Sequence, residues 1–126
     1  MDYEIPKLTR AQINALIAVV LLIRKKISEG KPPYVTASEL APALGRSETR
    51  ARNLLNELRR AGLLKSLSSV PLIFGKEVDS RQVLWTTVFD SKDDEVIKQI
   101  IEKHADLVDK EMIYNCLQNL QKCLVD

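Results

Sequence analysis

The sequence predicts a mainly α-helical fold that carries one small β-hairpin, an α+β arrangement. Apolar residues recur with a helical period of about 3.6 over most of the chain. The pattern changes at residues 82–89, QVLWTTVF, which are β-branched and aromatic and therefore predict a strand, with residues 63–69 as its partner. A chain of 126 residues, 45% hydrophobic and 29% charged, is large and apolar enough to bury one core.

The first helix is expected at residues 10–29. Thr9 is a suitable N-cap, and Gly30 stands where a C-capping glycine belongs. One apolar stripe of this helix is expected to face the core, and a second apolar face lies opposite. Because a helix that is apolar all round must be covered all round, something besides the main core has to pack on this second face. The residues of the second face are Ala11, Ala15, Ala18, Val19 and Leu22.

A short extended segment and two shorter helices follow. The prolines before residues 34–35 favour an extended backbone there. The segment TASE, residues 36–39, is a capping box that begins a helix over 37–44, whose Pro42 implies a bent or short final part. Gly45 ends that helix, Ser47 caps the next one, and Gly62 closes it after residue 61.

Two helices are expected at the C-terminal end. SKDDE, residues 91–95, caps one that runs to about His104, and Asp106 begins another that reaches the C-terminus. His104 is expected to cap a helix or to be solvated. The last helix would place its apolar residues on one side, with polar residues opposite.

Residues 35–67, VTASELAPALGRSETRARNLLNELRRAGLLKSL, resemble the winged helix-turn-helix of bacterial and archaeal regulators. The segment has the short strand, the first helix, the glycine turn, the second helix and the AGLL exit into a hairpin. The resemblance implies a winged helix-turn-helix domain over residues 1–89, with the hairpin 63–89 as its wing, and a C-terminal helical extension over 90–126. It also implies DNA binding. The segment departs from the pattern at Pro42 and at Glu48.

The helix 47–61 itself supports this function. A helical projection places Ala51, Leu54, Leu55 and Leu58 on one buried stripe, and it places Thr49, Asn53, Asn56 and Arg60 on the opposite face. Short hydrogen-bonding side chains between flanking guanidinium groups suit the major groove and its phosphates. The residues predicted to contact DNA are Arg46, Ser47, Thr49, Arg50, Arg52, Asn53 and Asn56 from this helix, with Lys76 and Arg81 from the wing.

An ordinary solvated helix face remains the alternative for these arginines. Arg59 and Arg60 are expected to pair partly with Glu57 or with neighbouring residues, and Glu77 and Asp79 weaken the contribution of the wing. The charge distribution favours a polyanion only slightly. Residues 1–81 hold 14 Lys and Arg against 8 Asp and Glu, a net +6, whereas residues 82–126 hold 5 against 9, a net −4.

Other classes of function find little support. His104 is the only histidine, no serine or cysteine stands at a catalytic spacing, and the chain lacks a glycine-rich phosphate loop, so we predict no enzyme, no cofactor and no metal site. The most apolar run, residues 13–23, is too short to span a bilayer, and the start of the chain does not resemble a signal peptide. A cytoplasmic protein with no membrane partner is therefore expected.

The two ends of the chain predict a homodimer. The last helix needs an apolar partner, and the first helix has an unexplained apolar face, so the two are expected to form a two-fold interface; the alternative is that the last helix folds back on the first helix of its own chain. The expected interface residues are Ala15, Ala18, Leu22, Ile113, Cys116, Leu117, Leu120 and Leu124. The junction of these helices also offers a place for an effector. Cys116 and Cys123 are expected to be small apolar residues of one helix, or to form a disulfide across the dimer axis.

The leading hypothesis is thus a dimeric transcriptional regulator that binds specific double-stranded DNA. A winged-helix module for protein–protein interaction is the main alternative, and an architectural or partition role in DNA binding is another.

Overall fold

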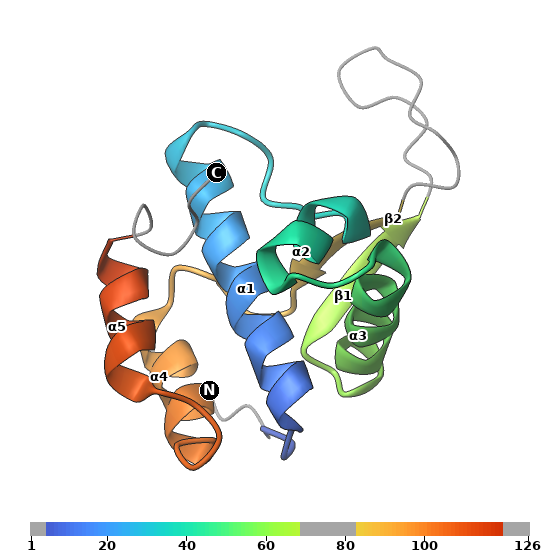
Figure 1. The fold of residues 1–126 in the computed structure, drawn as a ribbon. Helices are drawn as coiled ribbons and strands as arrows, with labels where there is room; N and C mark the ends of the chain where they lie inside the picture. The colour runs from blue at the N-terminus through green and yellow to red at the C-terminus, as the bar shows by residue number, and fades with distance from the viewer. Residues whose placement is uncertain (1–4, 69–82, 120–126) are drawn as a thin grey trace.

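The computed structural model describes residues 5–68 and 83–119 of the chain. Within these ranges the fold consists of five α-helices and one two-stranded antiparallel sheet (Figure 1). The elements are α1 (Arg10–Ser28), α2 (Ala37–Leu44), α3 (Glu48–Arg60), β1 (Leu64–Ser68), β2 (Val83–Thr87), α4 (Asp94–Lys103) and α5 (Lys110–Gln118). The prediction of a helical fold with one hairpin is confirmed.

Helix α1 is the centre of the molecule. It begins at a capping box formed by Thr9 and Gln12, and Gly30 follows its end with a φ of 71°. In Figure 1, α1 lies between α2, α3 and the hairpin on one side and α4 and α5 on the other. Both of its apolar faces are therefore covered within one chain, and its most deeply buried residues, each at most 1% exposed, are Ile13, Ala15, Leu16, Val19 and Ile23.

Both strands of the hairpin pack on the core, through Leu64 of β1 and Trp85 of β2. β1 and β2 pair with Leu64 opposite Thr87 and Ser66 opposite Trp85. Val35 extends this ladder by an isolated bridge, since its N–H donates to the Trp85 carbonyl at 2.9 Å and its carbonyl accepts from the Trp85 N–H at 2.8 Å. The extended segment expected at residues 34–35 is thus confirmed at Val35, which ties the start of the helix-turn-helix to the hairpin.

The last helix is shorter than predicted. It begins at Lys110 because the Asp109 carboxylate caps it by accepting the Met112 N–H at 3.2 Å, whereas residues 104–107 form a turn. It ends at Gln118, where Asn119 has a φ of −138° and a ψ of 90°. The prediction of a helix from Asp106 to the C-terminus was wrong at both ends, and residues 120–126 lie outside the described ranges.

A polar cluster joins α4 to α5. The Tyr114 hydroxyl donates to Glu102 Oε1 at 2.9 Å, and Lys110 Nζ donates to Glu102 Oε2 at 3.2 Å. These two hydrogen bonds lower the pKa of Glu102 below its ordinary value of 4.5. Burial, followed by the same hydrogen bond to Glu102, raises the pKa of Tyr114.

His104 is fully buried at the end of α4. Its Nε2 accepts the Leu8 N–H at 2.8 Å, and its Nδ1 lies 2.7 Å from the Ile100 carbonyl. These partners assign the proton to Nδ1 and leave Nε2 as the acceptor. His104 occupies a helix-capping position, one of the two expected arrangements. Its side chain is buried rather than solvated, because its ring holds the segment before α1 against α4.

The described residues contain no helix that is long and apolar enough to cross a membrane. Within residues 5–68 and 83–119, no group of three or more His, Cys, Asp or Glu side chains is placed to hold a metal ion.

Candidate nucleic-acid interface

A glycine turn sets α3 against α2. Gly45 has φ 63° and ψ 35°, a left-handed conformation that glycine adopts without steric cost. Its N–H donates to the Pro42 carbonyl at 3.2 Å, and the Arg46 N–H donates to the Ala41 carbonyl at 3.0 Å. Pro42 is accommodated inside α2, which keeps the predicted bounds. The turn therefore ends α2 and starts α3 within three residues.

The first turn of α3 is capped and exposed. Ser47 Oγ accepts the Arg50 N–H at 3.1 Å, as predicted for an N-cap. The hydroxyl still has its own proton to donate, and both Ser47 and Arg46 are exposed. This end of the helix therefore presents a hydroxyl and a guanidinium group to solvent.

The two faces of α3 differ as the projection predicts. The inner face is buried, at no more than 3% exposure, and consists of Ala51, Leu54, Leu55 and Leu58. Thr49, Arg52 and Asn53 are exposed, and Asn56 is half-buried. The buried leucines fix the helix on the core, so the polar side chains are displayed from a rigid support.

Two of the predicted cationic contacts are next to carboxylates. Arg52 Nη2 lies 3.0 Å from Glu48 Oε1, one turn earlier on the exposed side of α3. Arg50 Nη1 lies 3.7 Å from Glu57 Oε2. Glu57 also accepts a hydrogen bond from Gln12 Nε2 at 2.9 Å, which joins α3 to the start of α1. Arg50 is therefore part of a contact between helices as well as a surface cation.

Three other arginines near α3 form no ion pair with the described residues and are open to a bound anion. Arg46, Arg59 and Arg60 are exposed, and none of them forms an ion pair with another residue in the described ranges. The expected pairing of Arg59 and Arg60 with Glu57 or with neighbours is not found among the described residues, because Glu57 is turned toward Arg50 and α1. The unpaired positive charge of the interface thus lies at both ends of α3.

The hairpin follows α3 as a wing would. Glu48 and Arg52 border a small depression formed together with the first turn of α2 and strand β2, where it is lined by Thr36, Ala37, Ser38, Val83 and Trp85. Lys76 and Arg81, the predicted contacts from the wing, lie outside the described residues.

The residues predicted to form a dimer interface are mostly covered inside one chain. Ala15 is 0% exposed, Ala18 is 9% exposed, and Ile113 and Cys116 are each 5% exposed. Leu22 and Leu117 are half-buried, whereas Leu120 and Leu124 lie outside the described residues. Helix α5 folds back on α1 of its own chain, the arrangement left open as the alternative.

Cys116 takes part in a disulfide. The expectation that it acts as a plain apolar residue was wrong, although the side chain is buried. That expectation depended on one helix running through both cysteines, but α5 ends at Gln118. Cys123 lies outside the described residues.

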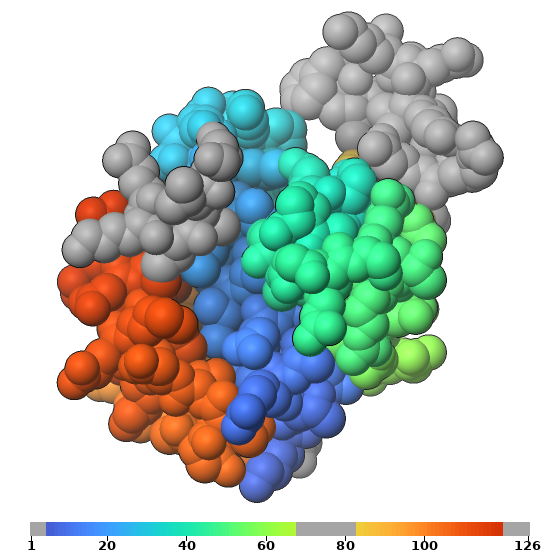
Figure 2. Space-filling view, in the orientation of Figure 1, coloured from blue at the N-terminus to red at the C-terminus, as the bar shows by residue number. Residues whose placement is uncertain are grey.

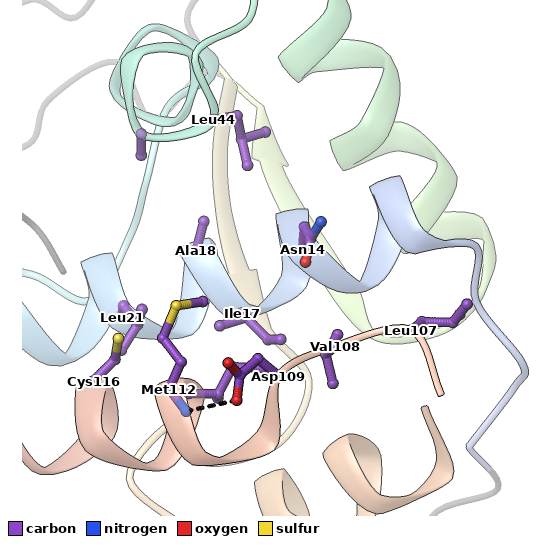
Figure 3. Close-up of a pocket in the computed structure, with 12 residues that line it drawn as sticks. Asn14, Ile17, Ala18, Leu21, Leu44, Leu107, Val108, Asp109, Met112 and Cys116 are labelled. Atoms are coloured by element: carbon purple, nitrogen blue, oxygen red, sulfur yellow. Dashed lines mark hydrogen bonds between the residues drawn. The ribbon is translucent and has the colours of Figure 1, made fainter. Parts of the chain in front are cut away.

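An open groove of about 570 Å³ lies between α1, the end of α2 and the start of α5 (Figure 3). Figure 2 shows this region as a strip of α1 between α2–α3 and α4–α5. Its lining is mainly apolar, with Asn14 and Asp109 as polar groups, and Met112 on its wall is 58% exposed. The groove reaches Leu44, the residue before the turn that starts α3.

Several of these features were not predicted from the sequence. The contact of Gln12 with Glu57 and the ring position of His104 join residues far apart in the chain, and no local pattern marks them. The pairing of Glu48 with Arg52 did have a signal, since opposite charges four residues apart on a helix are neighbours.

A comparison with protein-family models finds no matching family, and a comparison with curated proteins finds no similar sequence. Among solved structures, the fold resembles that of ZitR from Lactococcus lactis, a zinc-responsive member of the MarR family, at 20% sequence identity. The similarity covers 96% of this chain and 66% of that chain, with a TM-score of 0.48.

Proposed function

We propose that the chain binds specific sequences of double-stranded DNA as a dimeric transcriptional regulator, with α3 as the recognition helix and the hairpin as the wing. The observation that carries the proposal is the outward face of α3. This helix is the second of a helix-turn-helix, it is anchored by four buried apolar residues, and it displays amide and hydroxyl groups between unpaired arginines. Such a helix fits the major groove, where its first turns meet base edges.

Each side chain on this face has a role that follows from its chemistry. Asn53 is exposed at the centre of the outward face, where an amide can bond both N6 and N7 of adenine. Thr49, one turn earlier, offers a hydroxyl and a methyl group for base edges. Arg46 and Arg60 have no competing carboxylate among the described residues, so they supply the phosphate contacts that orient the helix.

The second part of the proposal is a homodimer. It is supported by the apolar groove beside α1 and by Met112, which is 58% exposed on the groove wall. A two-fold dimer would present two α3 helices to successive major grooves and would favour a palindromic site. Sedimentation of the chain as a monomer at micromolar concentration would reject the dimer without affecting the proposed role of α3.

The main alternative is a winged-helix module that binds protein. Glu48 and Glu57 favour it, because they neutralise two of the arginines on α3 and lower its attraction for a polyanion. An architectural or partition role shares all the DNA contacts proposed above. Both as a regulator and in an architectural or partition role, the chain would bind DNA without catalysing a reaction.

The test is a binding titration with labelled random duplex at several salt concentrations, followed by selection of bound sequences from a random duplex pool. We expect binding that weakens steeply with salt, because phosphate contacts release counterions. We also expect a palindromic preference that Asn53→Ala relaxes without changing the salt dependence. Absence of binding to any duplex at low salt would reject the proposal in favour of the protein-binding module.

A further inference from the structure

The acidic residue Glu48 stands where DNA binding alone gives it no role. It is the first residue of α3, and its side chain is 55% exposed. A carboxylate in that place repels phosphates, and the first turns of a recognition helix are the part that meets base edges. Favourable placement at a helix start and the spacing of four residues from Arg52 account for the ion pair, but neither gives the pair a role toward DNA.

Glu48 and Arg52 form one composite group. Oε1 of Glu48 lies 3.0 Å from Nη2 of Arg52, and both side chains are about half exposed, at 55% and 51%. Neither side chain has another hydrogen bond within the described residues. The second carboxylate oxygen and the remaining N–H groups of the guanidinium, which has five in all, stay available to a ligand.

We propose that Glu48 and Arg52 together recognise a G·C base pair in the DNA bound by α3. This inference rests on the function proposed above, and it names a base pair that the target must contain. In the major groove, guanine presents two adjacent acceptors, O6 and N7, and its paired cytosine presents the N4 amino donor. The guanidinium of Arg52 matches the two acceptors, and the carboxylate of Glu48 matches the donor.

The other base pairs match this group less well. An A·T pair offers no two adjacent acceptors, because the N6 amino donor of adenine separates N7 from the O4 of thymine. Arg52 would then keep only one bond to the base edge. The ion pair is also neutral as a whole, so it adds little attraction for phosphates, which Arg46 and Arg60 are free to provide.

The location of the pair supports contact with bases rather than with the rest of the protein. Glu48 and Arg52 border the depression between the first turn of α2, α3 and β2, and both side chains are about half exposed. The second ion pair of α3 differs in this respect. Glu57 accepts a hydrogen bond from Gln12 of α1 and is therefore held by the core.

The experiment is selection from a random duplex pool with the wild type, Glu48→Ala, Glu48→Gln and Arg52→Ala, and with Glu57→Ala as a matched control. We expect every wild-type target to contain a G·C pair at one fixed position of each half-site, preferred about 5- to 100-fold over other pairs. Glu48→Ala and Arg52→Ala should lose that preference, and Glu48→Gln should admit an A·T pair there, because an amide pairs with adenine. Glu57→Ala should keep the wild-type preference.

The outcomes separate the two proposals. If Glu48→Ala strengthens binding to all duplexes equally and leaves every positional preference intact, Glu48 acts only as a repulsive charge and the inference is wrong, although DNA binding stands. The same holds if the wild type binds duplex without any fixed G·C position. If the wild type binds no duplex at low salt, the proposed function fails, and this inference fails with it.

Discussion

Replacing Arg46 and Arg60 with alanine together is expected to weaken DNA binding and to reduce its dependence on salt. Both side chains are exposed, one before the first turn of α3 and one in its last turn, and neither has an ion-pair partner among the described residues. Their loss therefore removes two full charges from the proposed interface without breaking a contact inside the protein.

The size of the effect follows from counterion release. Each phosphate contact contributes a slope of about −0.9 to the dependence of log K on log salt concentration. Two lost contacts reduce the slope by about 1.8 for each protomer and, at ~0.1 M salt, lower the affinity about 60-fold, or ~2.5 kcal/mol. Arg50→Ala should have a smaller effect, because Glu57 already lies 3.7 Å from the Arg50 guanidinium.

Fluorescence anisotropy with one labelled duplex at four or five salt concentrations measures both quantities. The control is Lys92→Ala with Lys98→Ala, which removes the same charge from two exposed positions, one just before α4 and one within it. If the control variant lowers the slope as much as the arginine variant, the effect comes from net charge, and the assignment of phosphate contacts to α3 is refuted.

Three further predictions concern the framework that holds this interface. Gly45→Ala should destabilise the fold by ~1–2 kcal/mol in urea denaturation, because a side chain is disfavoured at φ 63° although the space there is open; an unchanged midpoint would contradict the left-handed turn. Tyr114→Phe should raise the pKa of Glu102 toward its ordinary value in an NMR titration, and an unchanged pKa would exclude the hydrogen bond. In the wild type, the lowered pKa of Glu102 stabilises the fold above pH 4.5, and this contribution is lost as the pH falls through the lowered pKa. His104→Phe should cost ~1–3 kcal/mol and speed amide exchange at Leu8, whose N–H loses its buried acceptor, and unaltered exchange at Leu8 would disprove that contact.

Much of the helix-turn-helix was predictable because its signals are local. Thr36 and Ser47 cap the helices that follow them, and Gly45 takes the left-handed conformation that its position requires. The inner face of α3 follows from the spacing of its leucines alone. Capping groups, glycine turns and apolar periodicity act within a few residues, so the sequence contains them directly.

The features that were missed depend on contacts between distant segments. Leu8 and His104 are 96 residues apart in the chain, and Gln12 and Glu57 are 45 apart. The start of α5 was misplaced because Asp106 and Asp109 are equally good caps, and only Asp109 accepts the hydrogen bond that begins the helix. Choosing between such equivalent residues requires the tertiary packing.

The most direct test of the central claim is an NMR titration of the ¹⁵N-labelled chain with a selected duplex. The account predicts that the largest amide shift changes occur at residues 46–56, in the glycine turn and the first turns of α3. The amides of α4 and α5, which lie on the side of the protomer away from the DNA, should shift little. Shifts centred on the groove beside Met112, with the amides of α3 unchanged, would contradict the proposal that α3 is the recognition helix.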